Sequence, residues 1–397
     1  MNKFIITRQH YVGDSYFTAL LDEKDKFREI AFHPLSEENQ VVPGIICIAR
    51  VKKIAANLDA AFVDIAKGVT CYLETAHIKD AWFSKQCRSG KLTEGDELVV
   101  QITKEAIKTK YPIADTKLSL TGKYFVLTNE KRPLAISSKL CADEKERLCS
   151  QVQLFEPHSL IVRTNAAGAS PEELETEYRK LSSDYQKLAA TFHFRTCYSI
   201  LMPPKKFYEN AINHLYQEEL GEIITDDKNI FEELQQLYAG NPDILSKIRF
   251  YENDAISLGT LYSFETQIQR AISERVWMKS GAYLIIQPTE ALTVIDVNSG
   301  KNTSGKNAEE YYYKINLEAA AEISRQLRLR NISGIVIVDF INMAKEEQRK
   351  ELMHQFRLSL KEDPVPVRLV DITKLGLVEL TRKKERKTLL EQVAQLR

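Results

Sequence analysis

Two short hydrophobic runs of the chain each contain a carboxylate near their end. Asp296 lies in the run 292–299 and Asp339 in the run 335–342, and one long amphipathic helix is predicted between them. A β-α-β unit returns its second strand parallel to the first, so both carboxyl ends meet at one sheet edge, where α/β proteins bind ligands. Asn298 projects from the same strand face as Asp296. These hard oxygen ligands suit Mg²⁺ or Mn²⁺ and do not suit zinc.

A purely structural role for these aspartates is open at this point. An Asp after a hydrophobic strand is often a helix N-cap or a solvated loop group. Two of them in one β-α-β unit, one followed by Asn at i+2, favour a metal site. The spacing alone does not decide between the two interpretations.

The composition predicts a soluble, multi-domain protein. The chain has 397 residues, 44% hydrophobic and 28% charged, which is typical of about two to four globular domains. Its 55 basic and 55 acidic residues cancel, and this balance neither supports nor excludes a nucleic-acid partner. Six cysteines without a CxxC pair, and no secretory signal at the start, predict reduced thiols and a cytoplasmic location. Without a run of about 18 apolar residues, no membrane span is expected.

Residues 41–115 have the strand and turn rhythm of an OB-type β-barrel. The predicted strands are 44–51, 60–65, 70–74 and 97–103. The sheet face of such a barrel binds single-stranded nucleic acid by stacking bases on aromatic side chains. Phe62 and Tyr72 are candidate stacking residues and Lys110 is a candidate phosphate contact. The alternative for each aromatic ring is a place in the barrel core.

The regions before and after the barrel differ in predicted secondary structure. Three β-rich runs, 3–7, 16–21 and 27–32, are too few for a core and are expected to complete a sheet formed elsewhere. Residues 205–275 are predicted to be mostly helical, with amphipathic helices at 207–220 and 229–238.

A strand over 159–164 is predicted to deliver Arg163 and Thr164 into a loop of small residues. Ser170, Pro171 and Glu173 then predict a helix that begins with a capping box. An Arg fork beside a Thr hydroxyl suits a phosphate group. The alternative is a surface salt bridge, which strand-end arginines form more often.

The C-terminal region combines predicted helices at 308–330 and 345–361 with a strand at 365–371. A basic run follows within 373–387. It is either a solvated helix face or a grip for a polyanionic backbone.

Three stretches, 292–300, 316–330 and 334–343, strongly resemble the ribonuclease E/G family of bacterial endoribonucleases. The resemblance covers essentially the whole chain. It implies an α/β multi-domain fold in which an S1-type OB β-barrel and a 5′-sensor are inserted into a split RNase H-like subdomain, followed by a DNase I-like α/β catalytic subdomain. The implied boundaries are 1–38 and 205–275 for the RNase H-like parts, 39–115 for the barrel, 116–204 for the sensor and 276–397 for the catalytic subdomain.

The resemblance also implies roles for single residues. Asp296 and Asp339 would be the catalytic ligands of Mg²⁺, for which Mn²⁺ could substitute, and Asn298 would support Asp296. The implied sensor residues for a 5′-monophosphate are Arg163 and Thr164, with pocket backbone from Gly122 and Val126. The implied RNA-contacting residues are Phe62, Tyr72, Lys110 and Arg382. Tyr72 stands where the family pattern has Phe.

The sequence departs from the family pattern near its end. The family's Cys-Pro-x-Cys zinc link would follow the basic run, but no cysteine occurs beyond Cys197. Neither zinc nor the zinc-linked assembly with its small C-terminal domain is therefore expected, and a homodimer of another kind stays open. Asn342 stands where well-known members carry an Asp, which removes one negative charge.

The resemblance favours a Mg²⁺-dependent endoribonuclease specific for single-stranded RNA, acting in RNA processing or decay. Its products would carry 5′-phosphate and 3′-hydroxyl ends, and 5′-monophosphorylated RNA would be preferred. The alternative is a catalytically weak RNA-binding regulator derived from the same family. A metal-dependent DNase or phosphoesterase fits the two aspartates as well, but the barrel argues against it.

Overall fold

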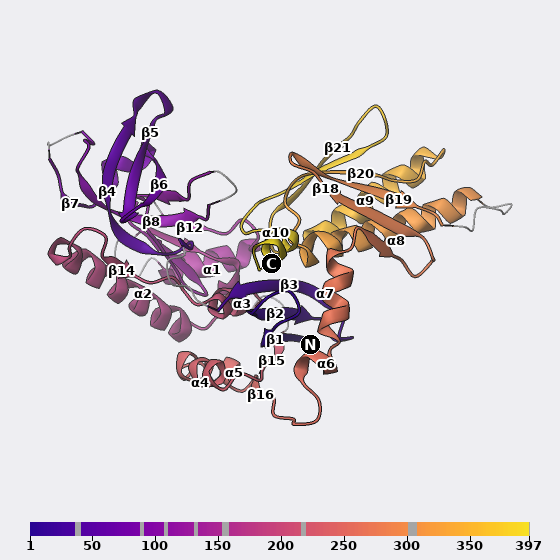
Figure 1. Ribbon diagram of the computed structural model, residues 1–397, viewed down its shortest axis with the longest axis horizontal. Coiled ribbons are helices and arrows are strands. Elements are labelled where there is room, and N and C mark those ends of the chain that lie inside the picture. Colours follow the sequence, from indigo (N-terminus) through magenta and orange to yellow (C-terminus); the bar gives the residue numbers. More distant parts are fainter. Residues whose placement is uncertain are drawn as a thin grey trace. The chain divides into compact units, whose positions relative to one another are not determined.

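The computed structural model describes residues 1–35, 41–87, 91–106, 110–130, 134–152, 159–215, 220–300 and 308–396. These residues fold into two compact units, one formed by 1–37 together with 218–397 and the other by 38–217. Each unit is built on its own sheets and hydrophobic clusters (Figure 1). Within the described ranges, no helix combines the length and the apolar character needed to cross a membrane.

A closed β-barrel forms part of the unit 38–217. Its strands are β4 (Ile46–Ala55), β5 (Ala60–Ala66), β6 (Val69–Glu74), β9 (Ile113–Asp115) and β8 (Glu97–Lys104), and β8 closes the barrel by pairing with β4. The short strands β7 (Phe83–Lys85) and β14 (Ile200–Met202) and the 3₁₀ turns η1 (Ala56–Leu58) and η2 (Thr75–Asp80) complete it. Alternate side chains such as Val63, Cys71 and Leu73 fill the interior. The predicted barrel is confirmed.

A smaller mixed sheet completes this unit. Its strand order is β10 (Ser119–Thr121), β11 (Phe125–Thr128), β13 (Ser159–Val162) and β12 (Ala135–Ile136). The remaining elements are α1 (Ala142–Val152), η3 (Thr164–Ala166), α2 (Pro171–Thr191), η4 (Phe192–Phe194) and α3 (Phe207–Leu215). Helix α2 begins with the predicted capping box between Ser170 and Glu173. Its buried residues Leu174 and Tyr178 pack in the same cluster as Phe125 of β11.

The first sheet of the other unit combines strands that precede residues 38–217 in the chain with strands that follow them. Its order is β16 (Ile248–Phe250), β15 (Leu220–Thr225), β1 (Asn2–Gln9), β2 (Ser15–Leu21) and β3 (Phe27–Pro34). β1 pairs in parallel with β15, so Ile5 lies opposite Ile224. The helices around this sheet are α4 (Lys228–Leu237), α5 (Pro242–Leu245), α6 (Leu258–Leu261), α7 (Phe264–Ile272) and α10 (Leu389–Leu396). The expectation that the N-terminal runs complete a sheet formed elsewhere is confirmed.

The helix predicted over 207–220 is wrong at its end. α3 ends at Leu215, and Leu220 already belongs to strand β15, while 216–219 lie outside the described residues. Ile223 and Ile224 are β-branched and lie in the sheet beside β1, where tertiary pairing outweighs local helix propensity.

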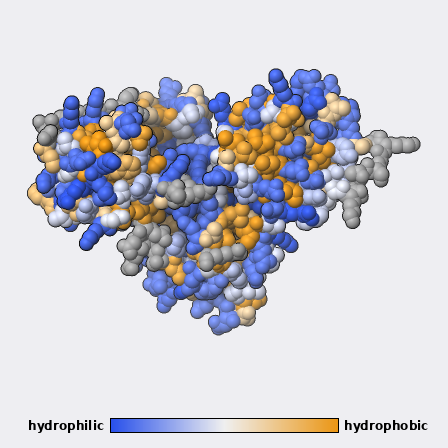
Figure 2. Space-filling view, turned by 45° about the horizontal axis from the view of Figure 1, so that its top comes forward, coloured by the Kyte–Doolittle hydropathy of each residue, from blue (hydrophilic) through white to orange (hydrophobic). Residues whose placement is uncertain are grey.

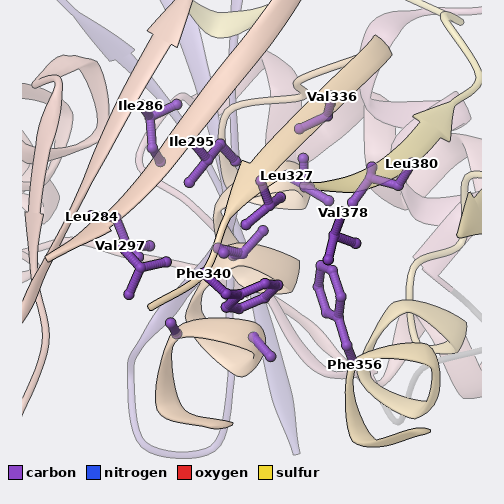
Figure 3. Close-up of a cluster of buried hydrophobic side chains, with 14 of the residues drawn as sticks. Leu284, Ile286, Ile295, Val297, Leu327, Val336, Phe340, Phe356, Val378 and Leu380 are labelled. Atoms are coloured by element: carbon purple, nitrogen blue, oxygen red, sulfur yellow. The ribbon is translucent and has the colours of Figure 1, made fainter. Parts of the chain in front are cut away.

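The second sheet of this unit carries the candidate metal site. Its order is β17 (Arg275–Trp277), β18 (Tyr283–Pro288), β19 (Leu292–Asn298), β20 (Gly334–Asp339), β22 (Val378–Arg382) and β21 (Val367–Ile372). α8 (Ala308–Leu329) and α9 (Glu346–Lys361) cover one face. Figure 3 shows the resulting core, in which Ile295, Val336 and Leu380 of the sheet meet Leu327 and Phe356 of the helices. β19 and β20 are parallel, as the β-α-β pattern predicts.

Candidate active site and RNA-contacting surfaces

Asp296 and Asp339 lie side by side at the carboxyl ends of β19 and β20. They are direct cross-strand partners in the parallel ladder, which places their Cα atoms about one strand spacing, roughly 5 Å, apart. Both side chains are exposed, whereas their neighbours Ile295 and Val338 are buried in the core. The alternation of the strands therefore turns both carboxylates to the same side of the sheet, away from α8 and α9.

Asn298 holds Asp296 in place. Its side-chain amide nitrogen donates a hydrogen bond of 2.6 Å to the Asp296 carboxylate. The two residues are neighbours on one face of β19 because their spacing is two. This contact is of the kind that the family resemblance implies for Asn298, and its role in a reaction stays a prediction.

The charge of the acidic pair is not compensated by protein cations. Among the described residues, no Lys, Arg or His forms an ion pair with Asp296 or Asp339. No cluster of three or more His, Cys, Asp or Glu side chains with metal-binding geometry occurs in the described ranges. A divalent ion at this edge would thus have two carboxylates as protein ligands and water in its other positions, an arrangement that Mg²⁺ accepts.

The loop after β20 is fixed by a residue that the sequence analysis did not single out. The side chain of Asn316, fully buried in α8, donates to the carbonyl of Ile341 at 2.7 Å and accepts from the Ile341 amide at 3.0 Å. This pair of bonds anchors the chain next to the exposed Asn342. The available signal was a polar residue on the apolar stripe of the helix, between Ile315 and Ala319.

On the barrel, Phe62 and Tyr72 lie on the outside of the wall. They are cross-strand partners on β5 and β6, partly exposed, with ring centroids 6.0 Å apart. The alternative of core positions is therefore wrong for both. Tyr111, which was not predicted from the sequence, is 53% exposed, and its ring centroid lies 5.4 Å from that of Phe62. The exposed Lys110 precedes Tyr111 in the chain, so an aromatic cluster and a cation occur together.

In the smaller sheet, Arg163 and Gly122 converge on one turn. The Arg163 guanidinium donates to the Gly122 carbonyl at 2.6 Å, and the Gly122 amide donates to the Phe125 carbonyl. The Thr164 hydroxyl lies 2.8 Å from that of Ser137. Val126 sits in the middle strand, opposite Thr121 and Ile161. The structure thus brings Arg163 and Gly122 together, with Thr164 next in the chain.

Glu177 organises this turn and was not predicted from the sequence. Its carboxylate accepts hydrogen bonds from the backbone amides of Lys123, Tyr124 and Phe125 at 2.7–2.9 Å. A Cβ atom on Gly122 would overlap this carboxylate, so a larger residue there would have to displace the Glu177 side chain. Burial lowers the pKa of the Arg163 guanidinium, and the nearby Glu177 carboxylate opposes that shift. Lys205, which donates to the Thr121 carbonyl, adds a second cation.

The prediction that Arg382 contacts RNA does not agree with its position. The residue is 3% exposed, and its guanidinium binds both carboxylate oxygens of Asp363 at 2.8 and 3.2 Å. It also donates to the side chain of Asn331 at 2.8 Å. Arg382 ends β22, whose alternation turns Val378, Leu380 and Arg382 inward. Its role is structural.

The basic run after Arg382 is largely neutralised within the protein. Lys383 pairs with Glu385, Lys384 with Glu391, and Arg386 with Glu29. The interpretation as a solvated helix face is wrong, because residues 378–382 form strand β22 and 383–387 lie in the loop after it. The pairing within the protein also argues against the other interpretation, a grip for a polyanion.

With this geometry established, comparison with known proteins defines the class. Residues 119–385 match the Ribonuclease E/G family, and the chain belongs to that family. It is similar to ribonuclease G of Salmonella typhimurium, with 30% identity over 373 residues that cover 90% of this chain and 76% of that protein. It is also similar to ribonuclease E of Haemophilus influenzae, with 31% identity over 347 residues covering 84% of this chain and 37% of that protein.

Ribonuclease E of Escherichia coli K12 gives 32% identity over 84% of this chain and 33% of its own length. The chain thus spans about a third of the curated ribonuclease E relatives that it matches, and about three quarters of the ribonuclease G relatives.

Proposed function

We propose that this protein is a Mg²⁺-dependent endoribonuclease that cuts single-stranded RNA and leaves 5′-phosphate and 3′-hydroxyl ends. The observation that carries the proposal is the in-register pair Asp296 and Asp339, exposed at one sheet edge without a compensating cation among the described residues. Family membership and the names of the relatives give the RNA-cleaving class.

The side chains have separate tasks in this proposal. Asp296 and Asp339 would hold the ion, and the hydrogen bond from Asn298 would keep the Asp296 carboxylate turned toward it. A bound Mg²⁺ would supply an activated water and charge stabilisation at the phosphodiester. The exposed rings of Phe62, Tyr72 and Tyr111 would stack bases and Lys110 would contact a phosphate, which favours unpaired RNA.

The turn around Gly122 suits a terminal phosphate. Arg163 supplies a guanidinium whose remaining N–H groups are available beyond the bond to Gly122, and Thr164 supplies a hydroxyl. We assign these residues, with backbone of Gly122 and Val126, to recognition of a 5′-monophosphate. The subdomain boundaries implied by the family resemblance and action in the cytoplasm are part of the same proposal.

Replacing either metal ligand tests the proposal. Asp296→Asn and Asp339→Asn should each lower kcat by at least about 100-fold, because a catalytic metal contributes several kcal/mol to the transition state. RNA affinity measured in EDTA should stay close to that of the unmodified protein. The assay follows cleavage of a 5′-monophosphorylated single-stranded RNA over a Mg²⁺ titration, with end-group analysis of the products.

Asp254→Asn is the matched control, because Asp254 is an exposed aspartate in a loop of the same unit. Full cleavage by both active-site variants would refute the metal assignment. If the unmodified protein binds RNA tightly but gives no Mg²⁺-dependent products, the result would support the alternative, a catalytically weak RNA-binding regulator. That alternative is suggested by Asn342, which stands where well-known family members carry an Asp.

A further inference from the structure

In the sheet that carries the acidic pair, α8 and α9 cover one face, and among the described residues several side chains of the other face are exposed to solvent. Val276, Leu284, Ile295 and Val336 point into the core under α8 and α9, so alternate residues of the same strands point the other way. Figure 2 shows hydrophobic side chains on the surface of the body that contains this sheet, and Ile335 is 49% exposed there.

The ladder aligns a row of residues across this exposed face. Arg275 of β17 is opposite Ile285 of β18, Ile285 is opposite Asp296 of β19, and Asp296 is opposite Asp339 of β20. A second row, two residues along, joins Trp277, Tyr283 and Asn298. The first strand therefore lies two strand spacings, about 10 Å, from the strand that bears Asp296.

Trp277, Tyr283 and Arg275 form a compact cluster on this face. The ring centroids of Trp277 and Tyr283 are 5.0 Å apart, and the Arg275 guanidinium lies 4.7 Å from the Tyr283 ring and 5.6 Å from the Trp277 ring. Trp277 remains 63% exposed. An exposed aromatic ring held by neighbouring side chains presents a flat face on which a ligand can stack, and Trp and Tyr are enriched at such binding surfaces.

A groove of about 670 Å³ runs beside the cluster. Arg275, Trp277 and Ile285 line it from the sheet, and Thr266, Gln269, Arg270 and Ser273 line it from α7 and its C-terminal end. Glu274 adds one carboxylate to the lining, and this carboxylate accepts a hydrogen bond from the Gln287 side chain at 3.5 Å. Among the described residues, neither Arg270 nor Arg275 is paired with a carboxylate. The groove thus combines an aromatic platform with two cations, the equipment that binds single-stranded nucleic acid by stacking and phosphate contact.

We propose that Trp277, Tyr283 and Arg275 form a base-stacking subsite for single-stranded RNA, on the same sheet face as Asp296 and Asp339. The inference rests on the proposed function for the position of the cleaved phosphate, and adds a contact on the β17 side of it. A base of the RNA stacks on the exposed Trp277 ring, Arg275 and Arg270 attract the neighbouring phosphates, and the strand then crosses the row toward Asp296.

Fluorescence gives a test that needs no cleavage. The chain contains two tryptophans, Trp82 and Trp277, and Trp82 stacks on Phe192 in the other unit. In a Trp82→Phe variant of the full chain, Trp277 is the only tryptophan. We expect its emission to be quenched when single-stranded RNA is added in EDTA, and a single 2-aminopurine placed at successive positions of the RNA to be quenched at one position.

Trp277→Ala should weaken RNA binding by about 5- to 150-fold, the loss of about 1–3 kcal/mol that removal of one stacking aromatic gives, and should abolish the position-specific quenching. Trp277→Phe should restore most of both. Phe250→Ala, which removes a 36% exposed ring of the other sheet of the same unit, is the control. Thermal unfolding of each variant verifies that the fold is intact.

The outcomes separate this proposal from the proposed function. Unchanged Trp277 emission and unchanged affinity of Trp277→Ala overturn the subsite, whether or not the protein cleaves RNA, and leave the exposed face for a protein partner. Position-specific quenching that is lost in Trp277→Ala supports the subsite even if Mg²⁺ produces no cleavage, a result that would count against the nuclease assignment alone.

Discussion

Asn298 donates a 2.6 Å hydrogen bond to Asp296, one of the two aspartates that the sequence predicts as metal ligands. Because Asn298 turns its N–H toward Asp296, we propose that it positions this carboxylate and does not itself bind the metal. This distinction matters for how substitutions at position 298 should behave.

Asn298→Ala should weaken Mg²⁺ binding and lower kcat by about 10- to 150-fold, since a hydrogen bond to a charged group contributes about 1.5–3 kcal/mol. Asn298→Asp should be at least as poor, because a carboxylate cannot donate and would repel Asp296. The measurement is the Mg²⁺ concentration for half-maximal cleavage, together with the RNA Kd in EDTA, which should not change. A fully active Asn298→Asp variant would show instead that position 298 ligates the metal through oxygen.

Some features of single residues could be predicted from the sequence and others could not. The pairing of Asp296 with Asp339 could be predicted because a β-α-β unit allows few arrangements. The burial of Arg382 could not, because it depends on Asp363 and Asn331, which no local pattern links to it. Trp277 was equally hidden, since its exposure follows from strand order.

At the scale of elements, the turn between β10 and β11 depends on α2. Glu177 reaches from that helix to three successive amides of the turn, and this is what presents Arg163 and Gly122 together. The strands and the capping box of α2 were predictable from alternation and from Ser170 and Glu173. The contact of Glu177 was not, because it joins elements more than 50 residues apart.

Gly122→Ala should therefore lower the preference for 5′-monophosphorylated over 5′-hydroxyl RNA, because its Cβ displaces the Glu177 carboxylate and loosens the turn. Arg163→Ala should have the larger effect, about 10- to 100-fold, through loss of charge-assisted hydrogen bonds. The measurement is the ratio of kcat/KM for the two RNA forms. Cleavage of 5′-hydroxyl RNA should change little. Gly240→Ala, at a position of the other unit where a Cβ atom meets no neighbour, tests whether any glycine replacement has this effect.

At the scale of the whole molecule, the two units have separate cores, so unfolding should not follow a single transition. Arg382→Ala leaves the buried Asp363 without its partner, which typically destabilises by about 3–5 kcal/mol. We expect this variant to lower the midpoint of one urea or thermal transition and to leave the other unchanged.

The exposed Arg368→Ala on β21 is the control and should move neither transition. A common shift of both transitions by Arg382→Ala would show that the units unfold as one. RNA binding by the folded Arg382→Ala protein should be normal, because this guanidinium faces the interior.

The parallel pairing of β1 with β15 delays completion of the first sheet during synthesis of the chain. Ile5 is opposite Ile224, so at the usual speed of synthesis, about 5–20 residues per second, the first strand waits on the order of 10–40 seconds for its neighbour. During that interval the whole segment 38–217 leaves the ribosome with its own cores complete. The three antiparallel strands β1, β2 and β3 meanwhile have an unpaired edge at β1. Such an edge is a site at which newly made chains associate wrongly. Chaperone demand for this protein should therefore concentrate on its first 35 residues.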